Sequence, residues 1–270
     1  MLLSNVIPTL TKEFYISQII NEQEISSLGL INAELEYSFC SFLEDIKFAD
    51  KITKNAKMII TKKEYIGLIP EGRGIYISEY PRLTYFLIHN YLSKLPIYKI
   101  RDDFDTIIDE NSEISPLACV AKKNVKIGKN VVIENFVTIK ENTIIGNDCK
   151  ILSGTVIGGD GFEFKRFPDG NILNVNHCGW TIIGNDVIIK SNTCIDKALY
   201  PWDITLISDH CRLDNLIYIA HGVKLLNSVF MAAGVSTGGR TIFGKNVWVG
   251  VGATVSNALT VGNNARINIG

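Results

Sequence analysis

The chain has 270 residues, of which 46% are hydrophobic, and its 27 Lys and Arg residues nearly balance 28 Asp and Glu residues. This composition predicts one or two folded domains with a substantial core and excludes a basic surface that would attract nucleic acid. The N-terminus shows neither the charged nor the long apolar segment of a secretory signal, and no apolar run suits a membrane-spanning helix. We therefore expect a cytoplasmic protein without nucleic-acid partners or membrane insertion.

The first hundred residues alternate short apolar runs with charged helical stretches, as in AKMIITKKEYIGLIP at 56–70. An amphipathic helix is predicted in YPRLTYFLIHNYLSKL at 80–95, with Pro81 in its first turn. The polar segment that begins at Arg101 reads as a junction. We expect a small α/β domain over residues 1–105 and a second domain over 112–270.

The second domain follows a period of six. Aliphatic residues stand six apart from 127 to 157, from 183 to 195 and from 207 to 267, with few exceptions, and Gly often follows them. Neither a helix nor a simple strand has this period, whereas a left-handed parallel β-helix does. In that fold the aliphatic residue points inward, the following Gly or Asn fits the corner, and residue i stacks on i+18. The predicted fold class is mainly β, a left-handed parallel β-helix preceded by a small α/β domain.

Two interruptions argue against a mere stiff spacer, the alternative that the period alone leaves open. A loop excursion at 158–181 is rich in Gly, aromatic and charged residues, and such loops usually carry binding function. The second interruption is LYPWD at 199–203, where the count of six is kept but no hydrophobic hexapeptide is found.

His221 lies two residues after Ile219, at a position where side chains point outward. The stacking rule places Asp203 one coil below it and Gly239 one coil above it. An imidazole can accept the proton of an attacking amine, and a backbone N–H can stabilise the oxyanion. This pattern predicts acyl transfer from a thioester to an amine, with a surface histidine as the alternative.

A zinc site is the rival chemistry, because some trimeric β-helix enzymes bind zinc with three histidines. His210 and His221 are separated by eleven positions, His89 lies in the other domain and His177 lies in the loop, so no metal site is expected. The six cysteines form no C-x-x-C pair and are interpreted as small packed thiols.

Three segments carry a family resemblance. IGGDGFEF at 157–164, NTCID at 192–196 and LDNLIYIAHG at 213–222 are similar to IGGDGFGF, NTTID and LDNLVQIAHN of the UDP-3-O-acylglucosamine N-acyltransferases, the LpxD family. FLEDIKFADKI and EYPRLTYFLI in the first domain also resemble family segments, so the resemblance covers nearly the whole chain.

The resemblance implies a role for each matching residue. His221 matches the general base, Gly239 matches the oxyanion-hole glycine, and Asp214 and Asn215 match the acidic and amide residues before the base. It also implies a homotrimer with sites between subunits, in which Asp214 and Asn215 act across an interface. The expected substrate-binding residues are Phe42, Asp45, Phe48, Asp160, Phe162, Phe164, His177 and Asp203.

The chain also departs from the family. Asp45 replaces an asparagine between two aromatics that grip uracil, a second family histidine falls at Ala258, Glu163 replaces glycine and His177 replaces glutamine. The run after NTCID, KALYPWD, is two residues longer. These changes favour a relative with an altered substrate. Arg240 is expected to be solvated, and Phe162 and Phe164 either wall the pocket or anchor the loop.

We expect transfer of an acyl group from acyl-CoA or acyl carrier protein to the amine of a nucleotide-activated amino sugar, for surface polysaccharide or lipopolysaccharide synthesis, with no bound cofactor. One alternative is LpxD activity itself, which adds a 3-hydroxyacyl chain to UDP-3-O-acylglucosamine. A further alternative is a non-catalytic nucleotide-sugar-binding scaffold, which loss of the second histidine fits but the retained IAHG and STGG segments do not.

Overall fold

The computed structural model describes all 270 residues, which divide into two compact units. The first contains residues 1–99 and 163–176, and the second contains residues 100–162 and 177–270. The sequence assigned the whole excursion at 158–181 to the second domain. The structure differs, because the middle of that excursion belongs to the first unit.

The first unit is built on a five-stranded mixed sheet with the order β1-β5-β4-β3-β2. β1 pairs antiparallel with β5, and the other neighbours are parallel. The predicted helix forms as α3, which has Pro81 in its first turn and packs on β3 and β4. The elements are α1 (Leu3–Val6), α2 (Leu10–Glu13), β1 (Ile16–Ile20), β2 (Ser27–Leu28), β3 (Phe39–Leu43), η1 (Ile46–Lys51), β4 (Ala56–Thr61), η2 (Lys63–Leu68), β5 (Gly74–Ser78), α3 (Pro81–Leu92) and η3 (Pro96–Tyr98).

The excursion joins this unit through a hairpin of β15 (Phe164–Arg166) and β16 (Ile172–Asn174). The Asn90 side chain on α3 donates to the Asn174 carbonyl at 2.6 Å and accepts from the Asn176 N–H at 2.9 Å. Buried His89 lies 2.8 Å from the Asn176 carbonyl. These contacts satisfy polar groups on the returning strand, which explains why the hairpin belongs with α3.

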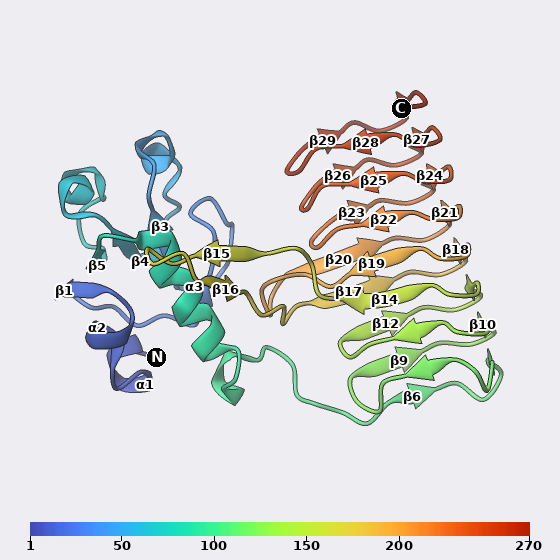
Figure 1. The fold of residues 1–270 in the computed structure, drawn as a ribbon, viewed down its shortest axis with the longest axis horizontal. Helices are drawn as coiled ribbons and strands as arrows, with labels where there is room; N and C mark the ends of the chain where they lie inside the picture. The colour runs from blue at the N-terminus through green and yellow to red at the C-terminus, as the bar shows by residue number, and fades with distance from the viewer. The chain divides into compact units, whose positions relative to one another are not determined.

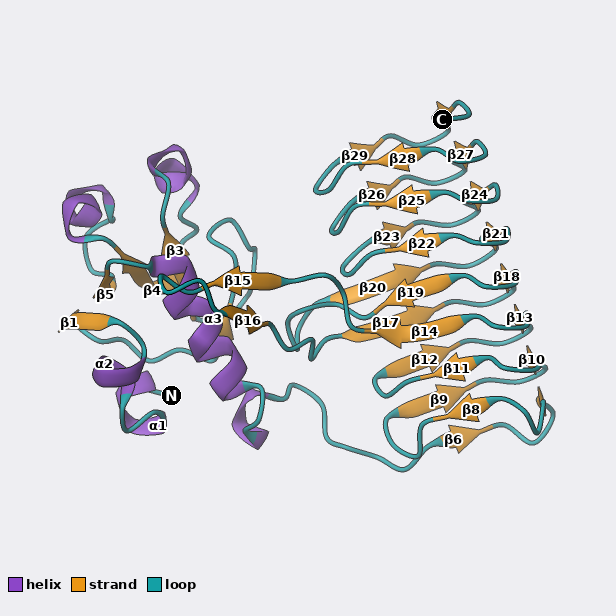
Figure 2. Ribbon diagram, in the orientation of Figure 1, coloured by secondary structure: helices purple, strands orange, loops and turns teal.

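The second unit is a parallel β-helix with three flat faces, stacked coil upon coil (Figures 1 and 2). The first face contains β7 (Glu113–Ile114), β10 (Val132–Ile133), β13 (Lys150–Ile151), β18 (Ile188–Ile189), β21 (Arg212–Leu213), β24 (Phe230–Met231), β27 (Trp248–Val249) and β30 (Arg266–Ile267). The second contains β8 (Cys119–Val120), β11 (Thr138–Ile139), β14 (Val156–Gly159), β19 (Cys194–Asp196), β22 (Tyr218–Ile219), β25 (Ser236–Thr237) and β28 (Thr254–Val255). The third contains β6 (Ile107–Ile108), β9 (Val125–Ile127), β12 (Thr143–Ile145), β17 (Trp180–Ile183), β20 (Ile204–Ile207), β23 (Lys224–Leu225), β26 (Ile242–Phe243) and β29 (Thr260–Val261).

The six-residue series forms the interior of this unit. Ile133, Ile151, Ile189 and Leu213 are at most 1% exposed and stack on successive strands of the first face. Each residue contributes one buried aliphatic side chain to a continuous core, worth about 1.5–3 kcal/mol. The predicted fold class, mainly β with a parallel β-helix after a small α/β unit, is confirmed.

The corners differ from the prediction in one respect. The residue with a left-handed backbone is usually the third after the inward aliphatic, as at Asn142 (φ 64°) and Gly222 (φ 69°), and not the glycine immediately after it. That glycine is required by close stacking, because a Cβ on Gly146 would lie 2.5 Å from the Gly184 carbonyl oxygen of the next coil.

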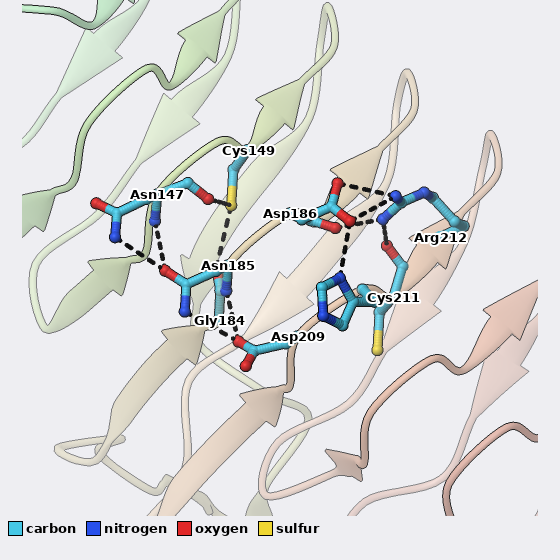
Figure 3. A network of polar contacts seen from close by, with 9 residues as sticks. Asn147, Cys149, Gly184, Asn185, Asp186, Asp209, Cys211 and Arg212 are labelled. Atoms are coloured by element: carbon cyan, nitrogen blue, oxygen red, sulfur yellow. Dashed lines mark hydrogen bonds and ion pairs between the residues drawn. The ribbon is translucent and has the colours of Figure 1, made fainter.

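Side-chain ladders close the corner between the third and first faces (Figure 3). The Asn185 Oδ1 accepts from the Asn147 N–H at 2.8 Å, and the Asp209 Oδ1 accepts from the Asn185 N–H at 2.6 Å. On the same corner, Asp186 binds Arg212 through both carboxylate oxygens. The ladder satisfies corner N–H groups that no strand can reach.

Candidate active site

The predicted site lies along one edge of the β-helix, the corner where the second face turns into the third. His221 follows β22 there, and Gly239 follows β25 directly above it, because Ile219 pairs with Thr237. Asp160 follows β14 and Lys197 follows β19 at the same corner. The sequence prediction that Gly239 stacks on His221 therefore agrees with the register.

Two glycines lie against the His221 imidazole. A Cβ on Gly239 would lie 2.8 Å from His221 Nε2, and a Cβ on Gly161 would lie 2.9 Å from His221 Cδ2. The Gly161 Cβ would also lie 2.9 Å from Nε2 of His177. Any larger side chain at either glycine would displace the imidazole. The sequence did not single out Gly161, although it lies in the quoted IGGDGFEF segment.

The backbone amide of Gly239 is available to a ligand. Its carbonyl accepts from the Ala258 N–H at 2.9 Å, but its own N–H donates to no acceptor in the chain. The neighbouring amides of Gly238 and Arg240 are used in the coil-to-coil ladder. An unpaired N–H beside an imidazole is the donor that an oxyanion requires.

His177 joins His221 at this corner. The two ring centroids are 5.5 Å apart and the planes are inclined by 71°. His177 is buried and His221 is partly exposed. The sequence assigned His177 to substrate binding, and the structure places it beside the predicted base.

Asp203 lies one coil below His221, as the stacking rule predicted, because it directly precedes β20, whose Leu206 pairs with Lys224 eighteen positions later. From Ile195 to its partner Ile219 the chain takes 24 residues, whereas from Ile219 to Thr237 it takes 18. The additional hexapeptide, which includes LYPWD, forms a loop at the corner instead of a side of the prism. The sequence marked LYPWD as an interruption, but because the insertion is six residues long, the unchanged count did not show that this hexapeptide leaves the prism.

Asp203 is paired with Arg240, which the sequence expected to be solvated. Arg240 Nη2 donates to Asp203 Oδ2 at 3.0 Å, and its guanidinium lies over the stacked rings of Tyr200 and Trp202, at 5.6 and 6.0 Å from their centroids. Burial raises the pKa of Asp203, while Arg240 and Lys224 act to lower it. The ion pair keeps a buried carboxylate beside the corner that carries His221.

A second carboxylate lies below His221, and the sequence did not predict it. The Tyr218 hydroxyl donates to Asp196 Oδ2 at 2.7 Å, and the buried position raises the pKa of Asp196 despite that bond. Lys197 forms an ion pair at 3.0 Å with the exposed Asp160. Asp196 lies in the NTCID segment and Tyr218 in LDNLIYIAHG, so both residues were visible in the sequence. Their contact was not predicted, because the extra hexapeptide changes the spacing between stacked residues from 18 to 24.

Asp214 and Asn215 follow β21, at the corner between the first and second faces, one corner before His221. Asn215 Nδ2 donates to Asp214 Oδ1 at 3.1 Å, and Lys190 pairs with the same oxygen at 3.1 Å. Hydrogen bonding to Lys190 lowers the pKa of Asp214 against a smaller effect of burial. The structure places these two residues at a different corner of the coil from His221.

The two loop aromatics belong to different units, Phe162 to the second and Phe164 to the first. Phe162 is 84% exposed, and Phe164 begins β15 with 43% of its surface exposed. The same loop contributes Lys165 to the first unit, a residue that was not predicted from the sequence. Its ammonium lies 4.4 Å from the Phe86 ring centroid and pairs with Glu163, and burial lowers the pKa of Lys165 to about 8.

The expected base-binding residues lie on and after β3. Phe42 packs on Tyr85 with centroids 4.9 Å apart. Asp45 caps η1, accepting the Lys47 N–H at 3.1 Å and pairing with its ammonium at 2.7 Å, and these bonds lower the pKa of Asp45. Phe48 is 38% exposed beneath the ammonium groups of Lys47 and Lys51. The Asp45 carboxylate, which stands where the family has an amide, is therefore bound to Lys47 of the same segment.

No group of three or more His, Cys, Asp or Glu residues is arranged to hold a metal ion. No helix is long and apolar enough to cross a membrane.

Comparison with known proteins finds a hexapeptide-repeat model and acyltransferase relatives that match this chain. Residues 124–159 match the bacterial transferase hexapeptide model. UDP-3-O-acylglucosamine N-acyltransferase 2 of Legionella pneumophila is 45% identical over 82 residues, which cover 30% of this chain and 23% of that protein. UDP-3-O-acylglucosamine N-acyltransferase of Campylobacter lari is 29% identical over 294 aligned positions, which cover 99% of this chain and 86% of that protein.

A UDP-N-acetylglucosamine acyltransferase from Campylobacter jejuni has a solved structure with a TM-score of 0.49, at 22% identity, over 61% of this chain and 63% of that chain. Matches to the Legionella relatives span about a quarter of their length. The matched repeat model shows a bacterial transferase hexapeptide segment at residues 124–159, and the long alignments show that the chain is similar to the UDP-3-O-acylglucosamine N-acyltransferases.

Proposed function

We propose that this protein transfers an acyl group from a pantetheine thioester to the amine of a nucleotide-activated amino sugar. The observation that carries the proposal is the pairing of His221 with the unbonded amide of Gly239 in successive coils. A base and an oxyanion donor on adjacent rungs are the two groups that direct acyl transfer requires. The relatives named as N-acyltransferases support an amine as the acceptor.

In the proposed reaction the sugar amine attacks the thioester carbon, and a C–N bond forms. The His221 imidazole accepts the proton that the amine loses, while the Gly239 N–H donates a hydrogen bond to the carbonyl oxygen as it becomes an oxyanion. Collapse of the intermediate breaks the C–S bond, and the imidazolium returns its proton to the leaving thiolate. The products are an amide and a free thiol, with no cofactor bound by the protein.

The donor is acyl-CoA or an acyl carrier protein, and the acceptor is a nucleotide sugar used in surface polysaccharide or lipopolysaccharide synthesis. Both kinds of substrate are made in the cytoplasm, where we place the protein. We further propose a homotrimer in which Asp214 and Asn215 of one subunit act at the His221 corner of a neighbour. Their position one corner away from His221 within the coil supports this arrangement.

LpxD activity is the second candidate, because relatives that align with most of the chain have that name. The changed residues Asp45 and His177 favour a different sugar or nucleotide. A non-catalytic nucleotide-sugar-binding scaffold is the third.

The test is release of free thiol from acetyl, 3-hydroxybutyryl and 3-hydroxymyristoyl thioesters on both carriers, against a panel of UDP- and dTDP-amino sugars that includes UDP-3-O-acylglucosamine. The wild type is compared with His221→Ala and with His210→Ala, an exposed histidine paired with Asp186 at another corner. We expect sugar-dependent thiol release in the wild type and in His210→Ala alone. Binding of a nucleotide sugar with no thiol release from any donor would instead support the scaffold.

A further inference from the structure

The inserted loop Ala198–Asp203 connects β19 and β20 at the corner that carries both histidines. It consists of the extra hexapeptide in the 24-residue coil beneath His221. Ala198, Leu199, Tyr200 and Asp203 are almost completely buried, so the loop is packed and not a free surface excursion.

One side of the inserted loop holds the segment that carries His177. Leu199 O accepts from the Cys178 N–H at 3.0 Å, and Ala198 O accepts from the Gly179 N–H at 3.0 Å. A Cβ on Gly179 would lie 2.6 Å from the Tyr200 carbonyl oxygen. The backbone immediately after His177 is therefore fixed by the loop.

The other side holds the segment that carries His221. Gly222, with a left-handed φ of 69°, lies between Asp203 and Arg240, because its Cβ would be 3.3 Å from Asp203 Oδ2 and 3.3 Å from Arg240 Cγ. Its N–H donates to the buried Thr205 Oγ1 at 2.8 Å. The backbone immediately after His221 is thus enclosed on three sides.

The Asp203–Arg240 ion pair holds the inserted loop in this packed position. The Asp203 side chain is 8% exposed and the Arg240 side chain 27% exposed, so the pair is largely shielded from solvent. Arg240 also packs on the stacked Tyr200 and Trp202 rings of the same loop. Removing one partner leaves the other charge uncompensated and releases the loop from Arg240.

We propose that the inserted loop is a positioning element that sets the mutual orientation of His177 and His221, and that the Asp203–Arg240 pair holds it in place. The kinetic consequence rests on the proposed function, whereas the structural consequence does not. Neither Asp203 nor Arg240 is required to touch substrate, so both are positioning residues.

The first test needs no substrate. The chain has four histidines, so imidazole resonances of protein labelled with 15N-histidine report on each one separately. In Asp203→Asn and Arg240→Ala, we expect the His177 and His221 signals to move, while His89 and His210, which lie elsewhere, keep theirs. Arg266→Ala is the matched control, since that guanidinium lies 5.7 Å from the Trp248 ring centroid on the first face. Unmoved His177 and His221 signals, or equal movement of all four, would overturn the proposal.

The second test uses the acyl transfer assay. Misorientation of a base typically costs about 10²-fold in rate, so we expect kcat to fall 10- to 100-fold with little change in KM. The double variant of Asp203→Asn and Arg240→Ala is expected to be no slower than either single variant, because both substitutions remove the same ion pair. Arg240→Lys is expected to recover part of the rate. Additive losses, or a rise in the KM for the thioester alone in Arg240→Ala, would instead mean that Arg240 binds the donor.

The two tests separate the two proposals. If the wild type transfers no acyl group to any sugar, the proposed function fails, and the histidine spectra still decide the role of the loop. Thermal unfolding of each variant identifies those that are folded. Asp203→Asn retains the shape of the aspartate side chain, and Arg240→Lys retains the positive charge without the planar guanidinium.

Discussion

At the scale of single residues, Gly239 has two reasons to be glycine. Its missing Cβ leaves room for the His221 imidazole, and its N–H has no acceptor within the chain. The first is a steric requirement and the second an electrostatic one, and a single alanine substitution separates them, because alanine keeps the amide.

We predict that Gly239→Ala lowers kcat by about 10²-fold, because a Cβ 2.8 Å from Nε2 must displace the imidazole. Gly262→Ala is the control, since its Cβ would meet nothing within 4 Å. Steady-state kinetics on both variants test this. Full activity in Gly239→Ala would show that the imidazole position is not critical.

Tyr218 stabilises a buried charge. We predict that Tyr218→Phe lowers the free energy of unfolding by about 1.5–3 kcal/mol, the usual value of a hydrogen bond to a charged group. The folded-state pKa of Asp196 is raised, so its unfavourable contribution is present at neutral pH and disappears as the pH falls through that pKa. Urea unfolding should therefore show that Tyr218→Phe lowers the free energy of unfolding less at acidic pH than at neutral pH. An equal loss at both would contradict the assigned role.

At the scale of elements, the hexapeptide period predicted the coils because every inward position must be small enough to stack and apolar enough to be buried. It marked an interruption at LYPWD but could not show that Ala198–Asp203 leaves the prism, because an insertion of one hexapeptide leaves the count of six unchanged. The contact of Tyr218 with Asp196 was missed for the same reason, since 24 residues separate Ile195 from Ile219. A periodic pattern determines which residues point inward, but not how many residues each corner contains.

The corner glycines give a prediction at this scale. We predict that Gly146→Ala destabilises the protein by about 1–3 kcal/mol, because the new Cβ would lie 2.5 Å from the Gly184 carbonyl oxygen and would force the coils apart. Gly262→Ala again provides the control, and denaturant unfolding measures both. Equal midpoints for the two variants would contradict the close-stacking explanation.

At the scale of the whole molecule, the chain folds as two units, and residues 163–176 belong by their contacts to the first. The sequence could not assign this hairpin, because its hydrogen bonds to Asn90 depend on tertiary contacts between residues more than 80 positions apart. The family resemblance implied that Asp214 and Asn215 act across a subunit interface. Within the chain they lie one corner before His221, because each hexapeptide turns the chain to the next corner.

The proposed trimer predicts complementation. His221→Ala and Asp214→Ala should each be nearly inactive alone. Mixing them before reassembly should restore part of the activity, because some sites then combine an intact His221 with an intact Asp214 from a neighbour. Analytical ultracentrifugation should give three times the 30.0 kDa chain mass. A monomer, or mixed assemblies as inactive as their parents, would contradict a shared site.

The most direct measurement is the mass and linkage of the sugar product. Wild-type protein, incubated with an acyl thioester and the amino sugar that supports thiol release, should yield a nucleotide sugar heavier by one acyl group and linked through nitrogen. His221→Ala should yield none above background, and His210→Ala should match the wild type. The same amide product from His221→Ala at the wild-type rate, or an ester in place of the amide, would contradict His221-dependent N-acyl transfer.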